Sequence, residues 1–429
     1  MSNKTAYAVI GANLGDEGKG LTTDYLCYLS KGPTTVVRFN GGAQAGHTVT
    51  TSNTRHVFHH YSSGSFLDAD TYLSKDFICN PILFMKEKRK FLGNGTPNFK
   101  VIADPRCLVT TPWDMMINQI IEERRGLSRH GSCGVGINET VVRNEKPEYH
   151  FTLSNILDAM SADTHEVSVK LEKMQREWVW FRLAQLGIKE CDLTSAEMYN
   201  LLSFEIKQHF LDDLDTFRQT VHMTKPEYFQ AYKGQIIFEG AQGLALDQNA
   251  EDFPYVTRSN TGLKNVIPLC KEMGIEVLKP VYVTRPYLTR HGQGPLPNEL
   301  PGAPWDSVID NTNIPNKWQG MLRFGWIDES KLSLRINEDL ENARLQAGKD
   351  LKIEPTIMLT CVDQIPGGLE QGYVRFSNDD IRHSSSVPEF LTTLGKRIGA
   401  KDRCYVSLGP TRKDVLPLDQ IVTTTKEKV

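Results

Sequence analysis

Residues 5–39 read TAYAVIGANLGDEGKGLTTDYLCYLSKGPTTVVRF, which is an apolar run, a glycine-rich turn, a helical segment and a second apolar run. The runs at 5–11 and 34–39 predict buried strands, because each is short, apolar and closely followed by glycines. Residues 19–29 predict a helix with Leu21, Tyr25 and Leu26 on one side. A strand, turn, helix and strand within this length are typical of a parallel βαβ unit. We therefore predict an α/β fold with a central, mostly parallel sheet flanked by helices.

The rest of the chain extends this pattern. Further strands are predicted at residues 234–240, 277–284, 355–360 and 403–407, and a helix at 391–398. Between about 150 and 230, apolar residues recur at spacings of three and four, which predicts a helical excursion with a core-facing stripe that includes Leu171, Met174, Trp178 and Phe181. Because the chemical motifs run from residue 15 to residue 412, we predict a single domain over residues 1–429.

The composition excludes several classes of protein. The chain has 49 Lys+Arg and 52 Asp+Glu, hence a formal charge of −3, and no long basic run that would indicate nucleic acid as a partner. No apolar run approaches the roughly 18 residues that a membrane helix needs, and no apolar signal segment follows Met1. Eight cysteines without a Cys-x-x-Cys pair predict free thiols in a reducing compartment. We therefore expect a cytoplasmic protein that binds neither nucleic acid nor membrane.

The first strand leads into the strongest chemical motif, GDEGKG at residues 15–20. Its glycines let the backbone approach a ligand, the following helix offers free N–H groups, and Lys19 suits a phosphate. The motif is not a P-loop, because Asn13 stands where the first glycine would be and Gly20 follows the lysine. The alternative is a flexible charged turn.

Histidines follow the second strand. His47 lies among small residues in GGAQAGHT (41–48), and an imidazole at a strand end can donate or accept a proton. The alternative is a loop histidine bonded to backbone. His56, His59 and His60 resemble a metal cluster, but strand geometry would place His59 on the opposite face, so we predict a solvated or core strand.

Two later segments carry polar groups suited to ligands. FEGAQG (238–243) contains Gln242, whose amide both donates and accepts hydrogen bonds. Residues 255–261, YVTRSNT, bring together hydroxyls and an amide that suit a phosphate or a ribose.

In this order, the motifs resemble those of the adenylosuccinate synthetase family. The resemblance runs through GDEGKG (15–20), GGAQAGHT (41–48), FEGAQG (238–243), VTRSNT (256–261), TRHGQGPLPNEL (289–300), FGWID (324–328), LTCVD (359–363) and SLGPTR (407–412), and it is poor over 150–230. It implies a C–N bond-forming ligase. A nucleoside triphosphate, GTP in the family, phosphorylates the 6-oxygen of a purine nucleoside monophosphate, and the amine of L-aspartate displaces that phosphate.

The resemblance also implies the roles of the catalytic residues. Asp16 would take the proton from N1 and, with the carbonyl of Gly46, bind Mg²⁺. His47 would protonate or hydrogen-bond the departing phosphate oxygens, Lys19 would neutralise developing charge, and Gln242 would hold O6. We expect the loops at residues 41–55, 128–143 and 311–323 to close over the ligands, since closure excludes water from a reactive intermediate.

Three binding regions follow from the same resemblance. The GTP site would comprise Gly15, Glu17, Gly18, Lys19, Gly20, Gly46, His47, Thr48, Asp363, Ser407, Gly409 and Pro410. The carboxylate of Asp363 would accept two N–H groups of guanine, which favours GTP and leaves ATP open. The purine monophosphate site would comprise Asn13, Asp16, Gln44, Ala45, Ser132, Cys133, Arg143, Gln242 and Thr257. Gln319, Gly320 and Arg323 would bind aspartate. The resemblance further implies a homodimer in which Arg143 reaches the partner subunit's substrate.

The sequence departs from the family pattern at several of these positions. Gln44 replaces an asparagine, Cys133 a threonine and Cys361 a lysine, and the aspartate loop reads WQGMLR (318–323), so that of its arginine run only Arg323 remains. An arginine fork to a dicarboxylate is not replaced by Met or Leu. The changes lie in the monophosphate and amino-acid pockets, which indicates a retained reaction and an altered substrate.

We therefore predict the reaction of the phage 2-aminoadenylosuccinate synthetases, which use dGMP and supply the diaminopurine pathway. An ordinary reaction on IMP is the alternative, because Asp16 is retained. A third interpretation is a non-catalytic guanine-nucleotide-binding regulatory module. The joint presence of Asp16, Lys19, His47 and Gln242 argues against it.

Overall fold

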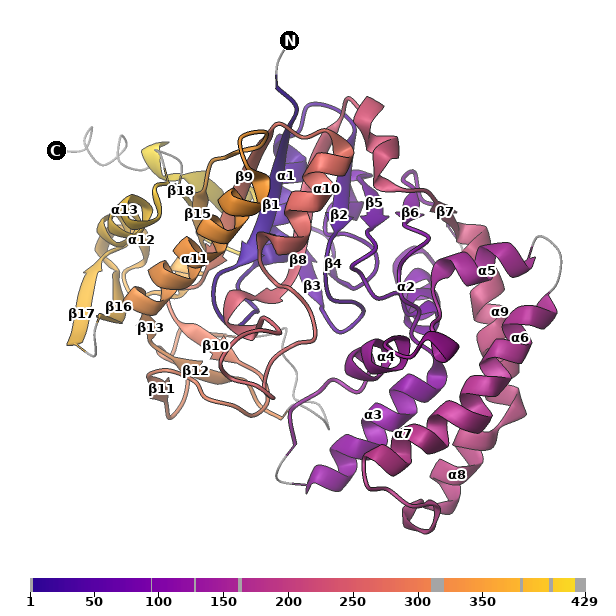
Figure 1. Cartoon of the computed structure of the whole chain (residues 1–429). Coiled ribbons are helices and arrows are strands. Elements are labelled where there is room, and N and C mark those ends of the chain that lie inside the picture. Colours follow the sequence, from indigo (N-terminus) through magenta and orange to yellow (C-terminus); the bar gives the residue numbers. More distant parts are fainter. Residues whose placement is uncertain are drawn as a thin grey trace.

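The computed structural model describes residues 3–93, 95–126, 129–160, 164–309, 320–378, 381–400 and 404–420. Within these ranges an eleven-stranded sheet forms the centre of the molecule (Figure 1). From one edge to the other its strands are β19 (Val415–Pro417), β18 (Cys404–Ser407), β15 (Thr356–Leu359), β9 (Val277–Thr284), β1 (Thr5–Gly11), β8 (Gln235–Gly243), β2 (Thr34–Arg38), β5 (Asp70–Leu73), β6 (Val101–Ala103) and β7 (Val221–Met223), with β14 (Lys352–Ile353) beside β9. The pairing of β18 with β19 is antiparallel, and the other pairings are parallel.

Both faces of this sheet are covered, as a parallel sheet requires. Successive residues of β1 point to opposite faces. On one face Ala8 and Ile10 join a core that includes residues of α10 (Val266–Met273), α11 (Glu329–Ala347) and α13 (Val387–Ile398). On the other, Val9 packs with α1 (Lys19–Leu29). Figure 1 shows α10 and α11 in front of the strands. The predicted fold class is confirmed.

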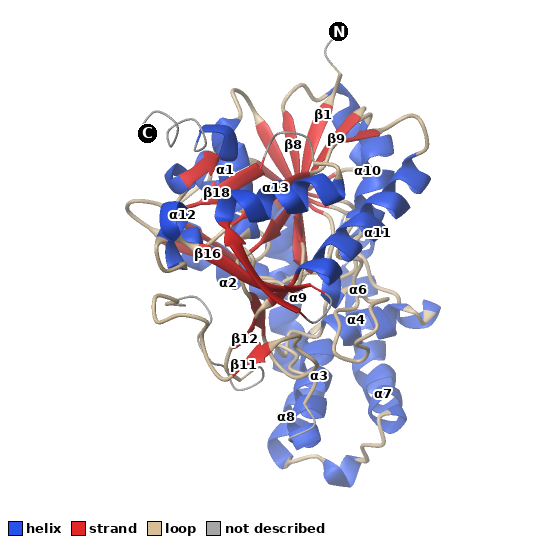
Figure 2. Ribbon diagram, turned by 90° about the vertical axis from the view of Figure 1, so that its left-hand side faces the viewer, coloured by secondary structure: helices blue, strands red, loops and turns tan. Residues whose placement is uncertain are grey.

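A helical lobe extends away from the sheet (Figure 2), and it adjoins the β7 edge (Figure 1). It contains α3 (Pro112–Arg125), α4 (Ile137–Asn144), α5 (Leu153–Met160), α6 (Thr164–Lys173), a π-helical turn (Met174–Trp178), α7 (Val179–Gln185), α8 (Ser195–Leu202) and α9 (Phe204–Thr220), and α2 (Pro81–Leu92) packs against α9. Leu171, Met174 and Trp178 are buried as predicted, whereas Phe181 is 45% exposed. The predicted helical span also contains β7, so the chain returns to the sheet before residue 230. The lobe and the strands β5–β7 share one hydrophobic cluster, so the lobe packs directly on this edge of the sheet.

Small sheets complete the fold near the carboxyl ends of the central strands. One contains β10 (Leu288–Arg290), β12 (Arg323–Gly325) and β11 (Glu299–Leu300), and another β13 (Ile327–Asp328), β16 (Tyr373–Asn378) and β17 (Ile381–Ser386). β3 (His47–Thr50) pairs with β4 (Arg55–Phe58), and α12 covers Gly368–Gln371. His56 and His60 are buried beside Glu87, but β4 ends before His59, so the three histidines do not share one strand as expected.

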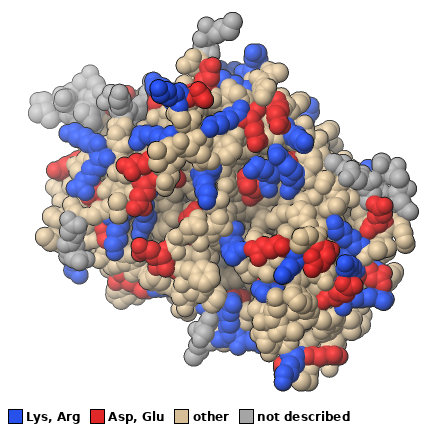
Figure 3. All heavy atoms as spheres, in the orientation of Figure 1, with Lys and Arg blue, Asp and Glu red and all other residues tan. Residues whose placement is uncertain are grey.

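Charges of both signs are mixed on the face shown in Figure 3. Among the described helices, none combines the length and apolar character needed to cross a membrane.

Candidate active site

A cleft of about 640 Å³ lies at the carboxyl ends of the central strands. All four predicted catalytic residues line it, namely Asp16, Lys19, His47 and Gln242. So do Gln44, Ala45, Gly46, Ser132, Cys133 and Thr257 of the predicted metal and monophosphate sites. These residues come from segments far apart in sequence, and parallel strands bring such segments to one edge of a sheet.

The loop between β1 and α1 has a backbone that few sequences permit. Gly15 and Gly18 have φ of 94° and 91°, and Asp16 itself is left-handed at 54°. A Cβ on Gly18 would lie 2.7 Å from Thr360 Cγ2, so this glycine allows the loop to approach β15 closely. Thr360 Oγ1 donates to the carbonyl of Glu17 at 2.8 Å. The loop is therefore held in shape by its neighbours.

Glu17 and Asn13 support this loop from beneath instead of lining the cleft. Both side chains are 3% exposed, and Glu17 Oε1 accepts from the backbone N–H of Asn13 at 2.6 Å. Asn13 Nδ2 donates to Thr284 Oγ1 at 3.0 Å. Burial raises the pKa of Glu17 to about 7, although the charge of Lys19 and hydrogen bonds from Asn13 oppose this rise. Any contact of Glu17 with a triphosphate would therefore use its backbone.

Asp16 forms an ion pair with His291, with 3.0 Å between Asp16 Oδ2 and His291 Nε2. Burial acts to raise the pKa of Asp16, but the hydrogen bond and charge of His291, and the charges of Arg285 and Lys19, outweigh it. The net effect lowers the pKa, so the carboxyl is ionised at neutral pH. An ionised carboxylate is the state that a base requires.

His47 is held by a buried carboxylate. Its Nδ1 lies 2.7 Å from Glu239 Oε1, and Glu239 also accepts from Ser63 and faces Arg38 at 3.6 Å. Burial lowers the pKa of His47 to about 4 against the opposing charge of Glu239, so the ring is neutral at pH 7. A neutral ring that donates from Nδ1 presents Nε2 as an acceptor. Nε2 is buried and has no hydrogen-bond partner among the described residues.

Two glutamines line the cleft. The register of β1 against β8 shifts between Val9 and Gly11, which marks a bulge in β8. Gln242 lies in this bulge and has φ of 63°. Such bulges commonly re-aim a side chain beside a functional site. Both amide atoms of Gln44 are buried without a hydrogen-bond partner among the described residues. A buried unsatisfied amide is costly, so a polar ligand is its natural partner.

The segment between α3 and α4 brings Ser132 and Cys133 to the cleft. Ser132 Oγ donates to Asn118 Oδ1 at 2.8 Å and accepts from the N–H of Gly134, which orders the loop. Burial raises the pKa of Cys133 to about 11, so the thiol is neutral. The backbone N–H of Thr257 donates to the carbonyl of Leu246. Ser132 and Thr257 are therefore placed by local bonds.

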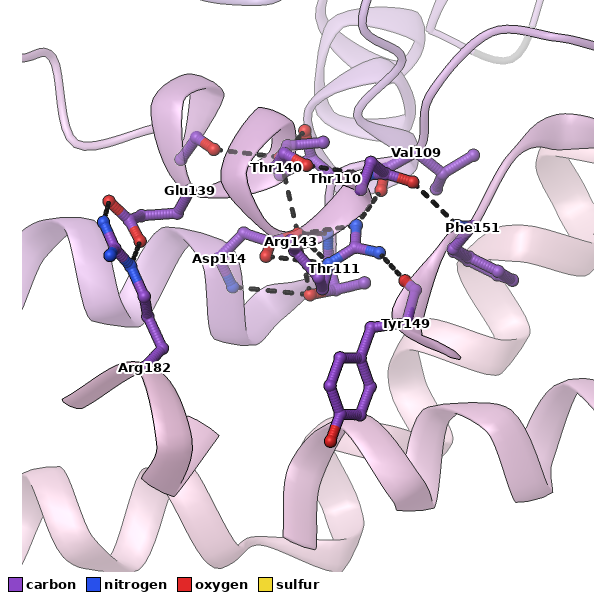
Figure 4. A network of polar contacts seen from close by, with 12 residues as sticks. Val109, Thr110, Thr111, Asp114, Glu139, Thr140, Arg143, Tyr149, Phe151 and Arg182 are labelled. Carbon is purple, nitrogen blue, oxygen red and sulfur yellow. Dashed lines mark hydrogen bonds and ion pairs between the residues drawn. The ribbon is translucent and has the colours of Figure 1, made fainter. Parts of the chain in front are cut away.

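Arg143, predicted to reach the partner subunit's substrate, is engaged within its own subunit in this structure. Its side chain is fully buried, and its guanidinium donates to Asp114 and to the carbonyls of Val109 and Tyr149 (Figure 4). Each of its three nitrogens is occupied within its own subunit. In this structure the Arg143 side chain therefore links α4 to α3 and to the backbone at Val109 and Tyr149.

The predicted guanine site lies beyond the lining of this cleft. Asp363 is exposed in a short turn after β15, and Ser407 ends the neighbouring strand β18, where its Oγ donates to the carbonyl of Gly409 at 2.5 Å. Partial desolvation of its carboxyl group and the charge of the adjacent Asp414 raise the pKa of Asp363. The remaining predicted GTP contacts, Gly20, Thr48 and Pro410, lie in α1, in β3 and beyond β18.

The predicted aspartate-binding residues are only partly described. Gln319 lies outside the described residues, and Gly320 is exposed with φ of 72°. Arg323 donates to Glu299 at 2.7 and 2.5 Å and to the carbonyls of Gly292 and Gly294. Its guanidinium thus holds a turn beside the cleft in this structure.

Sequence reasoning missed three residues that complete the site. Glu239 was visible inside the FEGAQG motif, but nothing in the sequence paired it with His47. His291 lies in the motif at 289–300 without a recognisable signal, and Arg38 lies in an ordinary strand. Each acts on a residue distant in sequence, so only the fold reveals it.

A sheet whose strand ends gather a glycine-rich loop, an ionised aspartate and an oriented histidine is typical of enzymes that transfer a phosphoryl group. The family model named "Adenylosuccinate synthetase" matches residues 8–338. The adenylosuccinate synthetase of Clostridium botulinum is 30% identical over 335 residues, covering 76% of this chain and 73% of the relative. That of a Cyanothece species is 31% identical over 343 residues, covering 77% and 71%. The chain belongs to the adenylosuccinate synthetase family and is a C–N bond-forming ligase.

Solved structures show the same fold. A fully ligated adenylosuccinate synthetase from Plasmodium falciparum superposes with a TM-score of 0.68 at 16% identity, covering 97% of this chain and 100% of the other. The succinoaminodeoxyadenylate synthetase of cyanophage S-2L, bound to dGMP and dATP, gives 0.57 at 15% identity, covering 97% and 96%. The non-catalytic interpretation is set aside by the family membership.

Proposed function

We propose that this ligase joins L-aspartate to dGMP at the expense of GTP, giving 2-amino-deoxyadenylosuccinate, GDP and phosphate. The convergence of Asp16, Lys19, His47 and Gln242 on one cleft carries this proposal. The reaction proposed needs no covalent bond to the enzyme, so the chemistry is positioning, proton transfer and charge stabilisation.

Each catalytic residue has one task. Asp16 takes the proton from N1 of the purine while O6 attacks the γ-phosphorus of GTP, and the bond from that phosphorus to the β–γ bridging oxygen breaks. Gln242 hydrogen-bonds O6. The amine of aspartate then attacks C6, the C6–O6 bond breaks, and phosphate leaves with O6. Lys19 and the N–H groups of the loop at residues 15–20 stabilise the charge on the transferred phosphoryl group. His47 Nε2 accepts a hydrogen bond from an oxygen of that group when the oxygen is protonated.

The cleft fits Mg²⁺ as a partner of the triphosphate. The carboxylate of Asp16 is 32% exposed and Gly46 is exposed, and both line the cleft. Mg²⁺ commonly takes one or two protein oxygens and fills its other positions with phosphate oxygens and water. Within the described part of the chain, no group of three or more His, Cys, Asp or Glu could hold a metal unaided. When bound, the ion would neutralise charge on the β- and γ-phosphates.

Two observations favour dGMP. Gln44 presents a buried amide oxygen without a hydrogen-bond partner among the described residues, and the 2-amino group of guanine is a donor that hypoxanthine lacks. The relative from cyanophage S-2L has the same fold and binds dGMP. IMP is the second candidate. One oxygen of the Asp16 carboxylate is occupied by His291, so the carboxylate has one fewer oxygen for the pair of N–H groups that guanine presents.

An assay with both substrates tests the proposal. Purified protein with L-aspartate, Mg²⁺ and either GTP or ATP receives dGMP or IMP, and mass spectrometry identifies the product. We expect product from dGMP with GTP as the better donor. Turnover of IMP alone would overturn the choice of substrate, and a lack of turnover with either monophosphate would overturn the ligase assignment. Asp16→Ala is expected to abolish phosphate release and to retain GTP binding.

We also propose a homodimer, on the resemblance to the family, and a cytoplasmic location. All eight cysteines are free thiols, which suits a reducing compartment. Analytical ultracentrifugation should give twice the chain mass of 48.4 kDa, and a mass of 48.4 kDa at micromolar concentration would exclude a stable dimer.

A further inference from the structure

His291 contacts Asp16, the predicted base, and takes no part in the reaction steps proposed above. It lines the same cleft as Asp16, and its Nε2 lies 3.0 Å from Asp16 Oδ2. The two side chains come from the loops after β1 and β10, and both line the cleft. The contact therefore depends on how firmly each loop is held.

The turn that carries His291 is held by two arginines. Arg290 donates to the carbonyls of Gln293, Pro295 and Tyr255 at 3.1, 3.0 and 2.8 Å. Arg323 donates to the carbonyls of Gly292 and Gly294 at 3.1 and 2.8 Å, and Glu299 fixes its other nitrogens. Hydrogen bonds from buried or half-buried guanidinium groups restrict the backbone of the turn. They therefore also fix the position from which the His291 side chain extends.

Asp16 is anchored on its own side. Its backbone is in the left-handed region. The carbonyl of the preceding Gly15 accepts a hydrogen bond at 3.4 Å from Oγ1 of Thr289, the residue before Arg290. The two loops are therefore connected independently of the Asp16–His291 pair. With both backbones fixed, the side-chain contact decides the rotation of the Asp16 carboxylate.

We propose that His291 is a positioning residue for the proposed ligase: by donating from Nε2 to Asp16 Oδ2, it turns the carboxylate so that Oδ1 faces N1–H of the purine. This inference rests on the proposed role of Asp16 as the base. A carboxylate that rotates freely spends part of its time with neither oxygen in line with the ring proton. Misplacement of a reacting group by about 1 Å can reduce a rate about 100-fold.

The inference predicts a loss of kcat with little change in KM. His291→Asn and His291→Gln form a matched pair, since both are amides and differ in reach by one methylene. The amide nitrogen of Gln can occupy the place of Nε2, whereas that of Asn corresponds to Nδ1 and falls short of Asp16. We expect kcat to fall roughly 30- to 100-fold in the Asn variant and to stay within about threefold of wild type in the Gln variant.

Two measurements and a control accompany the kinetics. Thermal unfolding confirms that both variants fold, and calorimetry measures binding of the monophosphate. The control is His222→Gln, at an exposed histidine in β7. Equal kcat in the Asn variant and wild type would overturn the positioning role, and so would an equal loss in both variants. A rise in KM at constant kcat would make His291 a substrate-binding residue, which also contradicts the proposal. Inactive wild type would instead refute the proposed function.

Discussion

Asp24 links α1, the helix that begins within the glycine-rich motif at residues 15–20, to Arg412 near the end of the chain. Its carboxyl is fully buried in α1, and Arg412 Nε lies 2.8 Å from its Oδ2. Burial raises the pKa of Asp24 to about 7 from an ordinary value of 3.8, and the charge of Arg412 opposes that rise. The folded state therefore retains this proton at a pH where the unfolded chain has lost it. The resulting stabilisation is complete below about pH 4 and is lost as pH rises through 7.

Asp24→Asn tests this coupling. An amide does not titrate, so the free energy of unfolding of wild type minus that of the variant should fall between pH 4.5 and pH 7, by up to about 1.4 kcal/mol per pH unit. Denaturant titrations at several pH values measure it. Asp350→Asn, at an exposed position, is the control and should show no such trend. A difference that rises with pH would mean that Arg412 dominates over burial.

Single residues were predictable from sequence where they belong to a continuous glycine-rich motif. Asp16, Lys19, His47 and Gln242 were found in this way, and all line one cleft. The pairing of Arg143 with Asp114 was not predicted, because a sequence shows an arginine but does not show the buried aspartate that binds it. For the same reason the partners Glu239 and His291 could not be predicted.

Between elements, the Arg143–Asp114 pair links α4 to α3. Both side chains are fully buried, so removal of the arginine leaves an uncompensated charge. Arg143→Met is expected to reduce the free energy of unfolding by about 3–5 kcal/mol, measured by denaturant titration.

The same variant tests the role that was predicted across a dimer. Mixed with Asp16→Ala subunits, Arg143→Met should show only the activity of its own folded fraction, since each nitrogen of Arg143 is bonded within its own subunit. Recovery of activity in the mixture would show that Arg143 leaves its network and acts in the partner's site.

The loop before α4 meets the turn of His291 at a glycine contact. Gly131 has φ of 82°, and a Cβ on it would lie 2.6 Å from Gly292 Cα. Gly131→Ala should therefore separate the two loops and raise KM for the monophosphate about tenfold. It should also lower the free energy of unfolding by about 1 kcal/mol or more, because alanine is strained at a positive φ. Gly302→Ala, where a Cβ meets open space, is the control. An unchanged KM would show that the loops do not shape the substrate site.

Elements with a clear apolar period were predictable. The strands at 5–11 and 277–284 and the helix at 19–29 have the predicted bounds. β5, β6 and β7 were missed because runs of three or four residues show no period, and they become strands only through parallel pairing with their neighbours. The helical lobe was recognised by its buried stripe, but its return to the sheet was not.

On the scale of the whole molecule, the cleft is bordered by loops from both the sheet and the lobe. GTP and dGMP together should draw these loops inward, and either nucleotide alone should do so less. Hydrogen exchange in peptides covering residues 41–50 and 129–136 should slow most with both ligands bound. Equal protection by each ligand alone would contradict joint closure.

The central chemical claim is that O6 of the purine captures the γ-phosphoryl group and departs with it. It is tested most directly with a monophosphate carrying a heavy oxygen isotope at position 6, incubated with GTP, Mg²⁺ and L-aspartate. We predict one heavy oxygen in each phosphate released. Phosphate without the label, with the heavy oxygen recovered in water or retained on the purine, would contradict the proposed reaction.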